Sequence, residues 1–381
     1  MFLQKSFYFF YHAAVASLLP FLVIFYDQLG LSGSQIGFLV GIPPLMYLIG
    51  APIWGGLADA TQKHKPILVL AITGTLVLVP FLLNISLFLI LIPVIAAFAF
   101  FLAPIMPLVD NSVMDMLGEL KIQYGKQRLW GAVGWGIAGP ITGWLIDRSG
   151  IQWAFYCYLL LMFLGLIIAL YLPIGNVSIG GKFWQEFRLL LSNRQWLLFL
   201  VMVFIGSLGI SIGSNFIFLY LDDLGASKTL MGLCLTFNTL GEIPFLYYSD
   251  RFLRKWGARG LLILALLTSS IRAFAYSLIK IPWLVLPIQL LHGPSYAALW
   301  VAGVTYADEV SPPGLGATAQ GLFAAVFMGF SYAIGAFIGG YLYENAGPVA
   351  MFRWIGAFVL LGLISYLLIG KNEQNLKQPI Q

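Results

Sequence analysis

Charged side chains are rare in this sequence, yet three residues able to bind a polar solute follow one another in an apolar stretch. Asp110 is followed eighteen residues later by Arg128, and Trp135 stands seven residues further on. Seven residues make two turns of an α-helix, so Arg128 and Trp135 would share one helix face. A carboxylate accepts hydrogen bonds, a guanidinium donates a planar fork of them, and an indole offers an apolar platform. This combination is suited to binding a small polar organic molecule.

Two simpler interpretations stay open for this first group. Arg128 lies near the start of an apolar segment, so its side chain could reach back to the membrane surface, as Lys126 is expected to do. Trp135 could equally face lipid or pack against a neighbouring helix. The availability of Asp110 as a charge partner favours a position for Arg128 inside a cavity, because a short loop would make the two helices antiparallel neighbours.

A second group of ionisable residues lies in the later half of the chain. Glu242 stands in the stretch TLGEIPF, and Arg272 and His292 follow in later apolar segments. An ionisable side chain inside a membrane costs a few kcal/mol or more unless it faces water or a partner. Glu242 is therefore expected to be protonated or paired, and a silent salt bridge with Arg272 is one alternative. His292 would either tune a proton-carrying carboxylate or be a packed histidine without such a role.

The elements that must position these residues follow from composition. Hydrophobic residues make up 60% of the chain and charged residues 9%, whereas soluble domains carry about 25% charged residues. The mean hydropathy is +0.91. Apolar runs of about 18–25 residues without alternation predict membrane-spanning helices. We expect twelve, and the fourth and eleventh carry Pro or Gly and should tilt or kink: 6–26, 35–57, 67–84, 87–116, 127–147, 152–173, 196–221, 229–249, 260–279, 283–307, 317–343 and 349–370.

The distribution of basic residues predicts the orientation. With both chain ends in the cytoplasm, fourteen of the 20 Lys and Arg residues fall in inner segments and four in outer ones. This predicts a multi-pass protein of the plasma or inner membrane, whose net charge of +5 has no bearing on nucleic acid. The first apolar run is expected to be a retained helix. Cys157 and Cys234 lie in apolar runs without a CxxC partner, so neither a disulfide nor a metal site is expected.

An internal repeat divides the chain. FYDQLGLSGSQIG, residues 25–37, matches YLDDLGASKTLMG at an offset of 195, and GWLIDRSG, residues 143–150, matches GYLYENAG at an offset of 197. Two six-helix bundles related by an axis along the membrane normal are a pattern of secondary transporters. The expected organisation is an amino-terminal bundle, a cytoplasmic linker, a carboxyl-terminal bundle and a cytoplasmic tail: 1–173, 174–195, 196–370 and 371–381.

Several motifs resemble the major facilitator superfamily. The loop GGLADATQKHK, residues 55–65, is similar to its signature of Gly-x-Leu-x-Asp followed by basic residues, although the usual Arg-x-Gly-Arg part is loose. LGLSGSQIG, APIWGGLAD, RLWGAVGW, LLHGPSYA and TAQGLF resemble the branch of phenylpropionate permease-like and nucleoside permease-like proteins, with lactose permease more distant. The resemblance implies an all-α fold of two pseudo-symmetric six-helix bundles. It also implies inner loops that latch the outward-facing state, with these candidates: Asp59, Lys63, Asp250, Arg251 and Arg254.

Roles for the membrane charges also follow from the resemblance to lactose permease. There, residues matching Asp110, Arg128 and Trp135 bind sugar hydroxyls and stack on the ring, and the residue matching Glu242 couples to proton movement. The sequence departs from that permease in having Gln289 and Ser295 instead of a lysine and a glutamate. Its dedicated proton carboxylate is therefore missing, and Glu242 or Asp110 would have to carry the proton, with His292 nearby.

The expected function is secondary active transport of a sugar, a nucleoside or an aromatic carboxylate by alternating access. The substrate would bind between Asp110, Arg128 and Trp135 on one side and Glu242, Arg272 and His292 on the other. Proton symport is the leading mechanism, an exporter, antiporter or uniporter is the alternative, and a receptor that does not transport is a remote one. No enzymatic activity, cofactor or nucleic-acid partner is expected; the partners are the solute and the lipid bilayer, and the chain would act as a monomer.

Overall fold

The structure is a computed structural model, and it describes residues 2–117, 124–174, 192–311 and 316–376. Each of the twelve predicted spans overlaps a helix. The earlier helices are α1 (Phe2–Leu18), η1 (Leu19–Phe21), α2 (Leu22–Gln28), α3 (Gly33–Thr61), α4 (His64–Asn84), α5 (Phe88–Leu102), α6 (Ile105–Leu117), α7 (Tyr124–Ser149) and α8 (Gln152–Tyr171). The later ones are α10 (Arg194–Asp223), α11 (Lys228–Tyr247), α12 (Ser249–Tyr276), η3 (Pro282–Leu284), α13 (Val285–Gln289), η4 (Gly293–Ala297), α14 (Ala298–Val310), α15 (Gly316–Ala324), η5 (Ala325–Phe330) and α16 (Ser331–Leu376).

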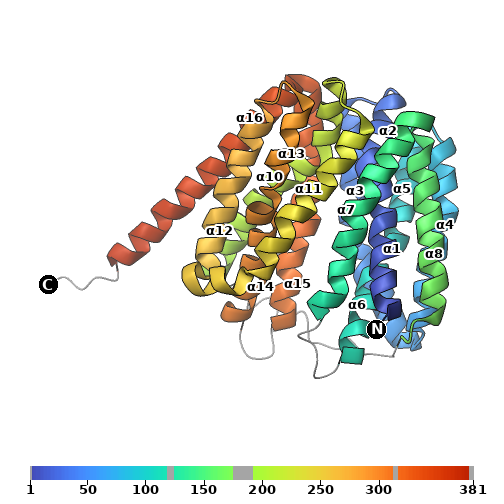
Figure 1. The fold of residues 1–381 in the computed structure, drawn as a ribbon. Helices are drawn as coiled ribbons and strands as arrows, with labels where there is room; N and C mark the ends of the chain where they lie inside the picture. Colours follow the sequence, from blue (N-terminus) through green and yellow to red (C-terminus); the bar gives the residue numbers. More distant parts are fainter. Residues whose placement is uncertain (1, 118–123, 175–191, 312–315, 377–381) are drawn as a thin grey trace.

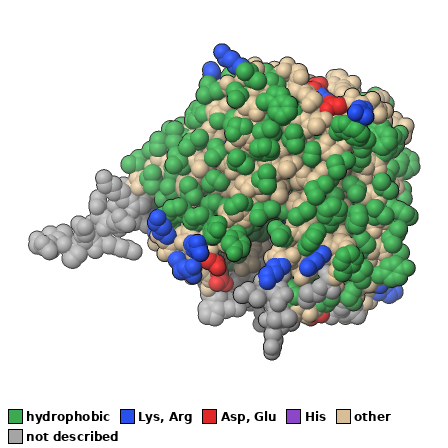
Figure 2. Space-filling view, in the orientation of Figure 1, with side chains coloured by type: hydrophobic (Ala, Val, Ile, Leu, Met, Phe, Trp, Pro, Cys, Tyr) green, Lys and Arg blue, Asp and Glu red, His purple; other side chains and the backbone are tan. Residues whose placement is uncertain are grey.

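Membrane insertion follows from the length and apolarity of these helices. The described residues form eleven segments long and apolar enough to cross a membrane, and the longest, Thr318–Ile369, has 52 residues. Gly347, with a φ of +78°, interrupts the helical backbone inside this segment just before Pro348, so two of the predicted spans meet there. Figure 2 shows hydrophobic side chains across the broad middle of the visible face and most of its charged side chains toward the upper and lower margins.

Both spans predicted to kink are irregular, and irregular helix also occurs in other spans, such as the 3-10 segment η1 in the first one. The predicted span 87–116 breaks between α5 and α6 at Ala103 and Pro104. The predicted span 317–343 contains a π-helical segment, η5. A second π-helical segment, η4, lies between α13 and α14, where the sequence carries Gly293 and Pro294. π-helical turns are rare and are frequent at functional sites, because the extra residue re-aims the side chains of the turn.

The two parts of the chain lie side by side, with α1–α8 on one side of Figure 1 and α10–α16 on the other. α3 packs against α16 and α7 packs against α11, so these four helices join the parts. Within the first part, α1 packs between α7 and α8. The predicted linker falls almost wholly outside the described residues, and α16 remains helical to Leu376.

Contact between the two parts is closest at the end of the molecule where α3 and α11 begin, the upper end of Figure 1. We call this end, with its loops 29–32 and 224–227, the closed end. A Cβ at Gly33 would lie 2.8 Å from the carbonyl oxygen of Gly340. Halfway along the helices, the Thr236 hydroxyl donates a hydrogen bond to the Gly136 carbonyl, 2.6 Å away. Toward the other end of α3, a Cβ at Gly55 would meet nothing within 4 Å.

A close helix crossing inside the later part supports a first prediction. A Cβ at Gly241 would overlap the Leu290 carbonyl, whereas a Cβ at Gly165 would meet nothing within 4 Å. Gly241→Ala should therefore lower the free energy of unfolding by about 1–3 kcal/mol, because the backbones must separate. Gly165→Ala is the matched control and should leave it unchanged or raise it by up to about 1 kcal/mol. Thermal unfolding in detergent measures both, and equal shifts would contradict the described crossing.

Candidate functional site

Asp110 and Arg128, eighteen residues apart, are brought together as predicted. Asp110 lies on α6, and Tyr8 of α1 donates a hydrogen bond to its Oδ1 over 2.5 Å. The Oδ2 atom of Asp110 lies 3.7 Å from Nη1 of Arg128, which is an ion pair at long range. Nη1 of Arg128 also donates to the Tyr124 hydroxyl over 3.1 Å. Two tyrosines therefore extend the predicted pair into a small polar cluster.

The Arg128 side chain faces the later part of the chain. It is 47% exposed and Asp110 is 22% exposed, although both lie in membrane-spanning helices. Arg128 interacts electrostatically with Tyr296 of η4 and with Glu242 of α11. An exposed guanidinium with partners on both parts of the chain is the arrangement expected in a polar space between them, because in lipid it would lack such partners.

Trp135 lies two turns beyond Arg128 on α7. It is partly buried and packs against the apolar core. This environment fits a packing residue as well as an aromatic platform, so its contact with a solute stays a prediction.

Arg272 is the most deeply buried charged group of the predicted site. Its side chain on α12 is 5% exposed. Nη2 donates to Gln289 Oε1 over 2.5 Å and to Asn238 Oδ1 over 3.2 Å. Nη1 lies 3.0 Å from Nδ1 of His292. A guanidinium can only donate, so Nδ1 of His292 is the acceptor and a neutral imidazole carries its proton on Nε2.

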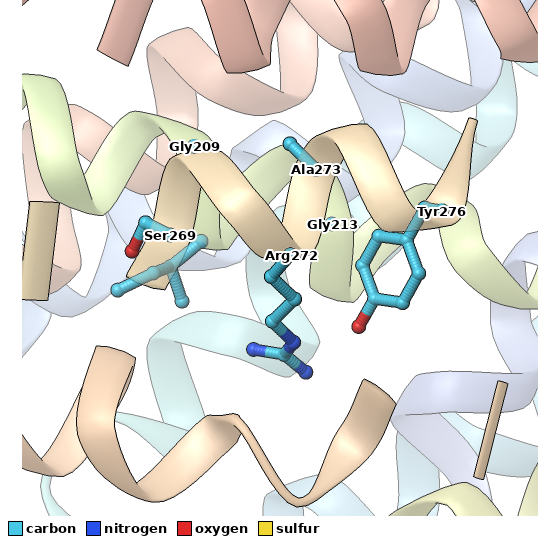
Figure 3. Close-up of a pocket in the computed structure, with 7 residues that line it drawn as sticks. Gly209, Gly213, Ser269, Arg272, Ala273 and Tyr276 are labelled. Carbon is cyan, nitrogen blue, oxygen red and sulfur yellow. The ribbon is translucent and has the colours of Figure 1, made fainter. Parts of the chain in front are cut away.

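Gln289 links two buried groups of α12. Its Oε1 atom also accepts a hydrogen bond from the Tyr276 hydroxyl over 2.8 Å, and Gln289 is itself 1% exposed. Figure 3 shows Arg272 and Tyr276 extending from the same helix toward the same side, and Ser269 is further along that helix. The small cavity beside them is lined by Gly209 and Gly213 of α10, which present no side chain to it.

The alternative in which Glu242 forms a silent salt bridge with Arg272 is wrong. The ion pairs among the described residues include none between Arg272 and a carboxylate. The Nη1 and Nη2 groups of Arg272 are directed to three neutral acceptors instead, which are Asn238, Gln289 and His292. Glu242 is partly buried on α11, and its electrostatic neighbours are Arg128, Tyr296 and Tyr332.

Tyr8, Asn238 and Tyr296 are site residues that the sequence did not indicate. The ring of Tyr296 stacks on His292 at 4.7 Å with an interplanar angle of 10°. The Gly-Pro pair in LLHGPSYA marks an irregular helix and could have drawn attention to Tyr296. Tyr8 has no such signal, because only the packing of α1 beside α6 and α7 brings it to Asp110.

The candidate inner-loop residues lie at helix junctions. Asp59 lies in the last turn of α3, and its Oδ1 lies 3.0 Å from Nε2 of His64, the first residue of α4. Lys63 is the N-cap position of α4, and Asp250 lies in the first turn of α12. The Arg251 guanidinium lies over the Tyr248 ring at 5.0 Å, and Arg254 is exposed. Their latch role stays a prediction.

Cys157 and Cys234 are free, and the described residues contain no cluster of three or more His, Cys, Asp or Glu side chains that could hold a metal ion.

The fold and the charged groups between the two parts define a helical membrane transporter of the major facilitator type. The chain belongs to the MFS_1 like family, whose model matches residues 2–354. It is 30% identical over 373 residues to a protein named maltose permease from Geobacillus stearothermophilus, covering 97% of this chain and 94% of that relative. It is 26% identical to a probable 3-phenylpropionic acid transporter of Escherichia coli (strain K12), covering 93% of each chain.

A comparison of structures agrees with this family. The crystal structure of nucleoside transporter NupG matches with a TM-score of 0.83 at 16% identity, covering 97% of this chain and 98% of that one. At this identity the likeness concerns the fold. The relatives and structural neighbours are transporters, so the expectation that the chain is not an enzyme is confirmed.

The role of Gln289 supports a second prediction. Gln289→Ala should lower the free energy of unfolding by about 1–3 kcal/mol, because it leaves buried donors of Arg272 and Tyr276 without an acceptor. Gln289→Glu keeps an acceptor at the same place and should remain closer to the native stability. Thermal unfolding of the purified variants measures the difference, and an unchanged Gln289→Ala protein would contradict the described network.

Proposed function

We propose that the protein is a proton-coupled symporter that carries a small polar organic solute across a membrane by alternating access. The observation that carries the proposal is the electrostatic interaction between ionisable groups of the two parts of the chain. Arg128 of the earlier part is paired with Asp110 and interacts with Glu242 and Tyr296 of the later part. A solute between the parts would meet a guanidinium, two carboxylates and phenol rings, which are the groups that bind hydroxyls and planar rings.

Three solute classes fit this combination of side chains. The relatives are named for maltose and 3-phenylpropionic acid, and the structural neighbour is a nucleoside transporter. Arg128 can donate to a hydroxyl, a carbonyl or a carboxylate, since its donors form a planar fork. Trp135 and Tyr296 would supply aromatic faces for a sugar ring, a base or a phenyl group.

Glu242 is proposed as the proton carrier. It is partly buried within a membrane-spanning helix, and Arg128 is the cation in whose field it lies. A carboxylate in such a position exchanges its proton when a charge or a solute arrives beside it. Asp110 is less suited, because its carboxylate already accepts a hydrogen bond from Tyr8 and is paired with Arg128. His292 is proposed as a neighbour that holds Arg272, which orders the wall of the site.

The membrane orientation is part of the proposal. Basic residues favour cytoplasmic chain ends in a plasma or inner membrane. The closed end would then face outward, and the described conformation would present its solute site to the cytoplasm.

Ligand-dependent stabilisation tests the solute class. Maltose, a nucleoside and 3-phenylpropionate are to be added separately to the purified protein, and the apparent melting temperature measured. Binding to the folded state should stabilise it by about 2.7 kcal/mol at one hundred times the Kd. Arg128→Lys should weaken the binding of the ligand that stabilises the native protein about tenfold or more, because a lysine cannot replace the planar fork of guanidinium donors. Stabilisation by none of the three classes would argue against the proposed solutes.

Glu242→Gln tests the proton coupling. We expect substrate binding and exchange to persist while pH-driven accumulation in proteoliposomes is lost, because the amide cannot take up the proton. Glu309→Gln, at the exposed end of α14, is the matched control and should accumulate solute normally. Undiminished uphill uptake by Glu242→Gln would exclude Glu242 as the carrier. Gradients of both signs separate a symporter from an exporter.

A further inference from the structure

A carboxylate from each part of the chain caps a helix of the other part at the closed end. Asp147 lies near the end of α7, and the first two residues of α11 donate to it. Its Oδ1 accepts from the Lys228 backbone N–H over 2.7 Å, and its Oδ2 accepts from the Thr229 backbone N–H over 2.8 Å. The Thr229 hydroxyl donates to Oδ2 as well, over 2.6 Å.

Glu344 on α16 makes the equivalent contact with α3. Its Oε2 atom accepts from the Ser34 backbone N–H over 2.8 Å, and the carboxylate also interacts with the hydroxyl groups of Ser34 and Ser32. The internal repeat relates the two contacts. Glu344 corresponds to Asp147 at the offset of 197, and Thr229 corresponds to Ser34 at the offset of 195. The same interaction is therefore present twice. The earlier part caps a helix of the later part, and the later part caps a helix of the earlier part.

At the start of α3 and of α11, the opposite part supplies a hydrogen-bond acceptor for backbone N–H groups. The first turns of α3 and α11 expose backbone N–H groups that have no partner within the helix. The N-cap residues satisfy the N3 position, since Ser32 accepts from Gln35 and Ser227 accepts from Leu230. The carboxylates accept from backbone N–H groups that these serine side chains do not bind, and the positive end of the helix dipole adds to the attraction.

A glycine one turn before each carboxylate lets its helix approach the facing helix closely. Gly143 precedes Asp147 by four residues and Gly340 precedes Glu344 by four, so glycine and carboxylate lie on one helix face. A Cβ at Gly143 would overlap the Lys228 carbonyl, and a Cβ at Gly340 would overlap the Gly33 carbonyl. The pattern Gly-x-x-x-Asp/Glu thus combines close backbone approach with a cap on the facing helix.

We infer that Asp147 and Glu344 are a pseudo-symmetric pair of interdomain caps that hold the closed end shut, and that this end opens when both release. The inference rests on the proposed alternating access. Opening would replace charge-assisted hydrogen bonds to backbone N–H groups by bonds to water, so the caps favour the closed state. The Lys228 side chain forms an ion pair with Asp222 within the later part, while its backbone N–H donates to Asp147.

A distance measurement tests the caps without any substrate. Nitroxide labels are placed at Leu87→Cys and Ile281→Cys, which are exposed and lie on loops of the two parts at the closed end. Cys157 and Cys234 are first replaced by Ser. Electron spin resonance then gives the ratio of long to short inter-label distances in lipid nanodiscs. The native chain should show mainly the short distance.

The expected result is a graded opening. Asp147→Ala should raise the ratio of open to closed molecules about fivefold, which is the usual effect of losing a helix cap. Glu344→Ala should shift it in the same direction, and the double variant should exceed either single one because the sites are separate. Arg148→Gln and Asn345→Ala are the matched controls and should have no effect, since Arg148 stacks on Trp144 and Asn345 donates to Tyr341 of its own helix.

A folded double variant that keeps the native distance distribution would overturn the inference. If the double variant does not fold, an unchanged distribution in folded Asp147→Ala has the same meaning. Failure of the caps is distinguishable from failure of the proposed function. If the chain opens on loss of the caps but accumulates none of the tested solutes, the inference about the caps is supported and the symport proposal is refuted.

Discussion

The low polarity of the membrane interior is the constraint on which the rest of this structure depends. A charge there must find a partner or water, because its desolvation otherwise costs several kcal/mol. Arg272 meets this requirement with Asn238, Gln289 and His292, all neutral. Arg128 meets it with Asp110 and with its exposure to the space between the two parts. Arg128 is thereby held where the solute is proposed to bind, and Arg272 is held inside the later part.

Helix packing between the two parts meets a different requirement. The helices must approach closely without binding each other strongly. Apolar side chains gain little by leaving lipid for another helix, so small residues and polar contacts govern association. The contact of α7 with α11 and of α3 with α16 uses glycines against backbone carbonyls. Such surfaces are flat, and a pair of helices can separate from them without disturbing an interdigitated core.

The irregular helices place the site next to these surfaces. The π-helical η4 presents Tyr296 beside His292, and Asp110 lies on α6 after the break that separates this helix from α5. The proposed caps at the closed end and the proposed site between the two parts share a helix, since Arg128 and Asp147 both lie on α7. Motion of α7 relative to α11 would therefore act on the solute contacts and on the cap together.

The sequence by itself determined the fold and part of the site. Apolar runs of membrane length, the basic asymmetry and the repeat at offsets of 195 and 197 predict two six-helix bundles, because these features depend only on local composition and order. The meeting of Asp110 with Arg128 also followed from spacing, since a short loop forces their helices to be neighbours.

Only the tertiary structure decided which groups complete that site. Tyr8 reaches Asp110 from more than one hundred residues away, and Arg272 turns to Gln289 instead of Glu242. Helix rotation and tilt select these partners, and both depend on how side chains of distant helices pack. The repeat placed Asp147 and Glu344 in equivalent positions, but their caps on α11 and α3 exist only because the glycines one turn earlier bring the facing backbones together.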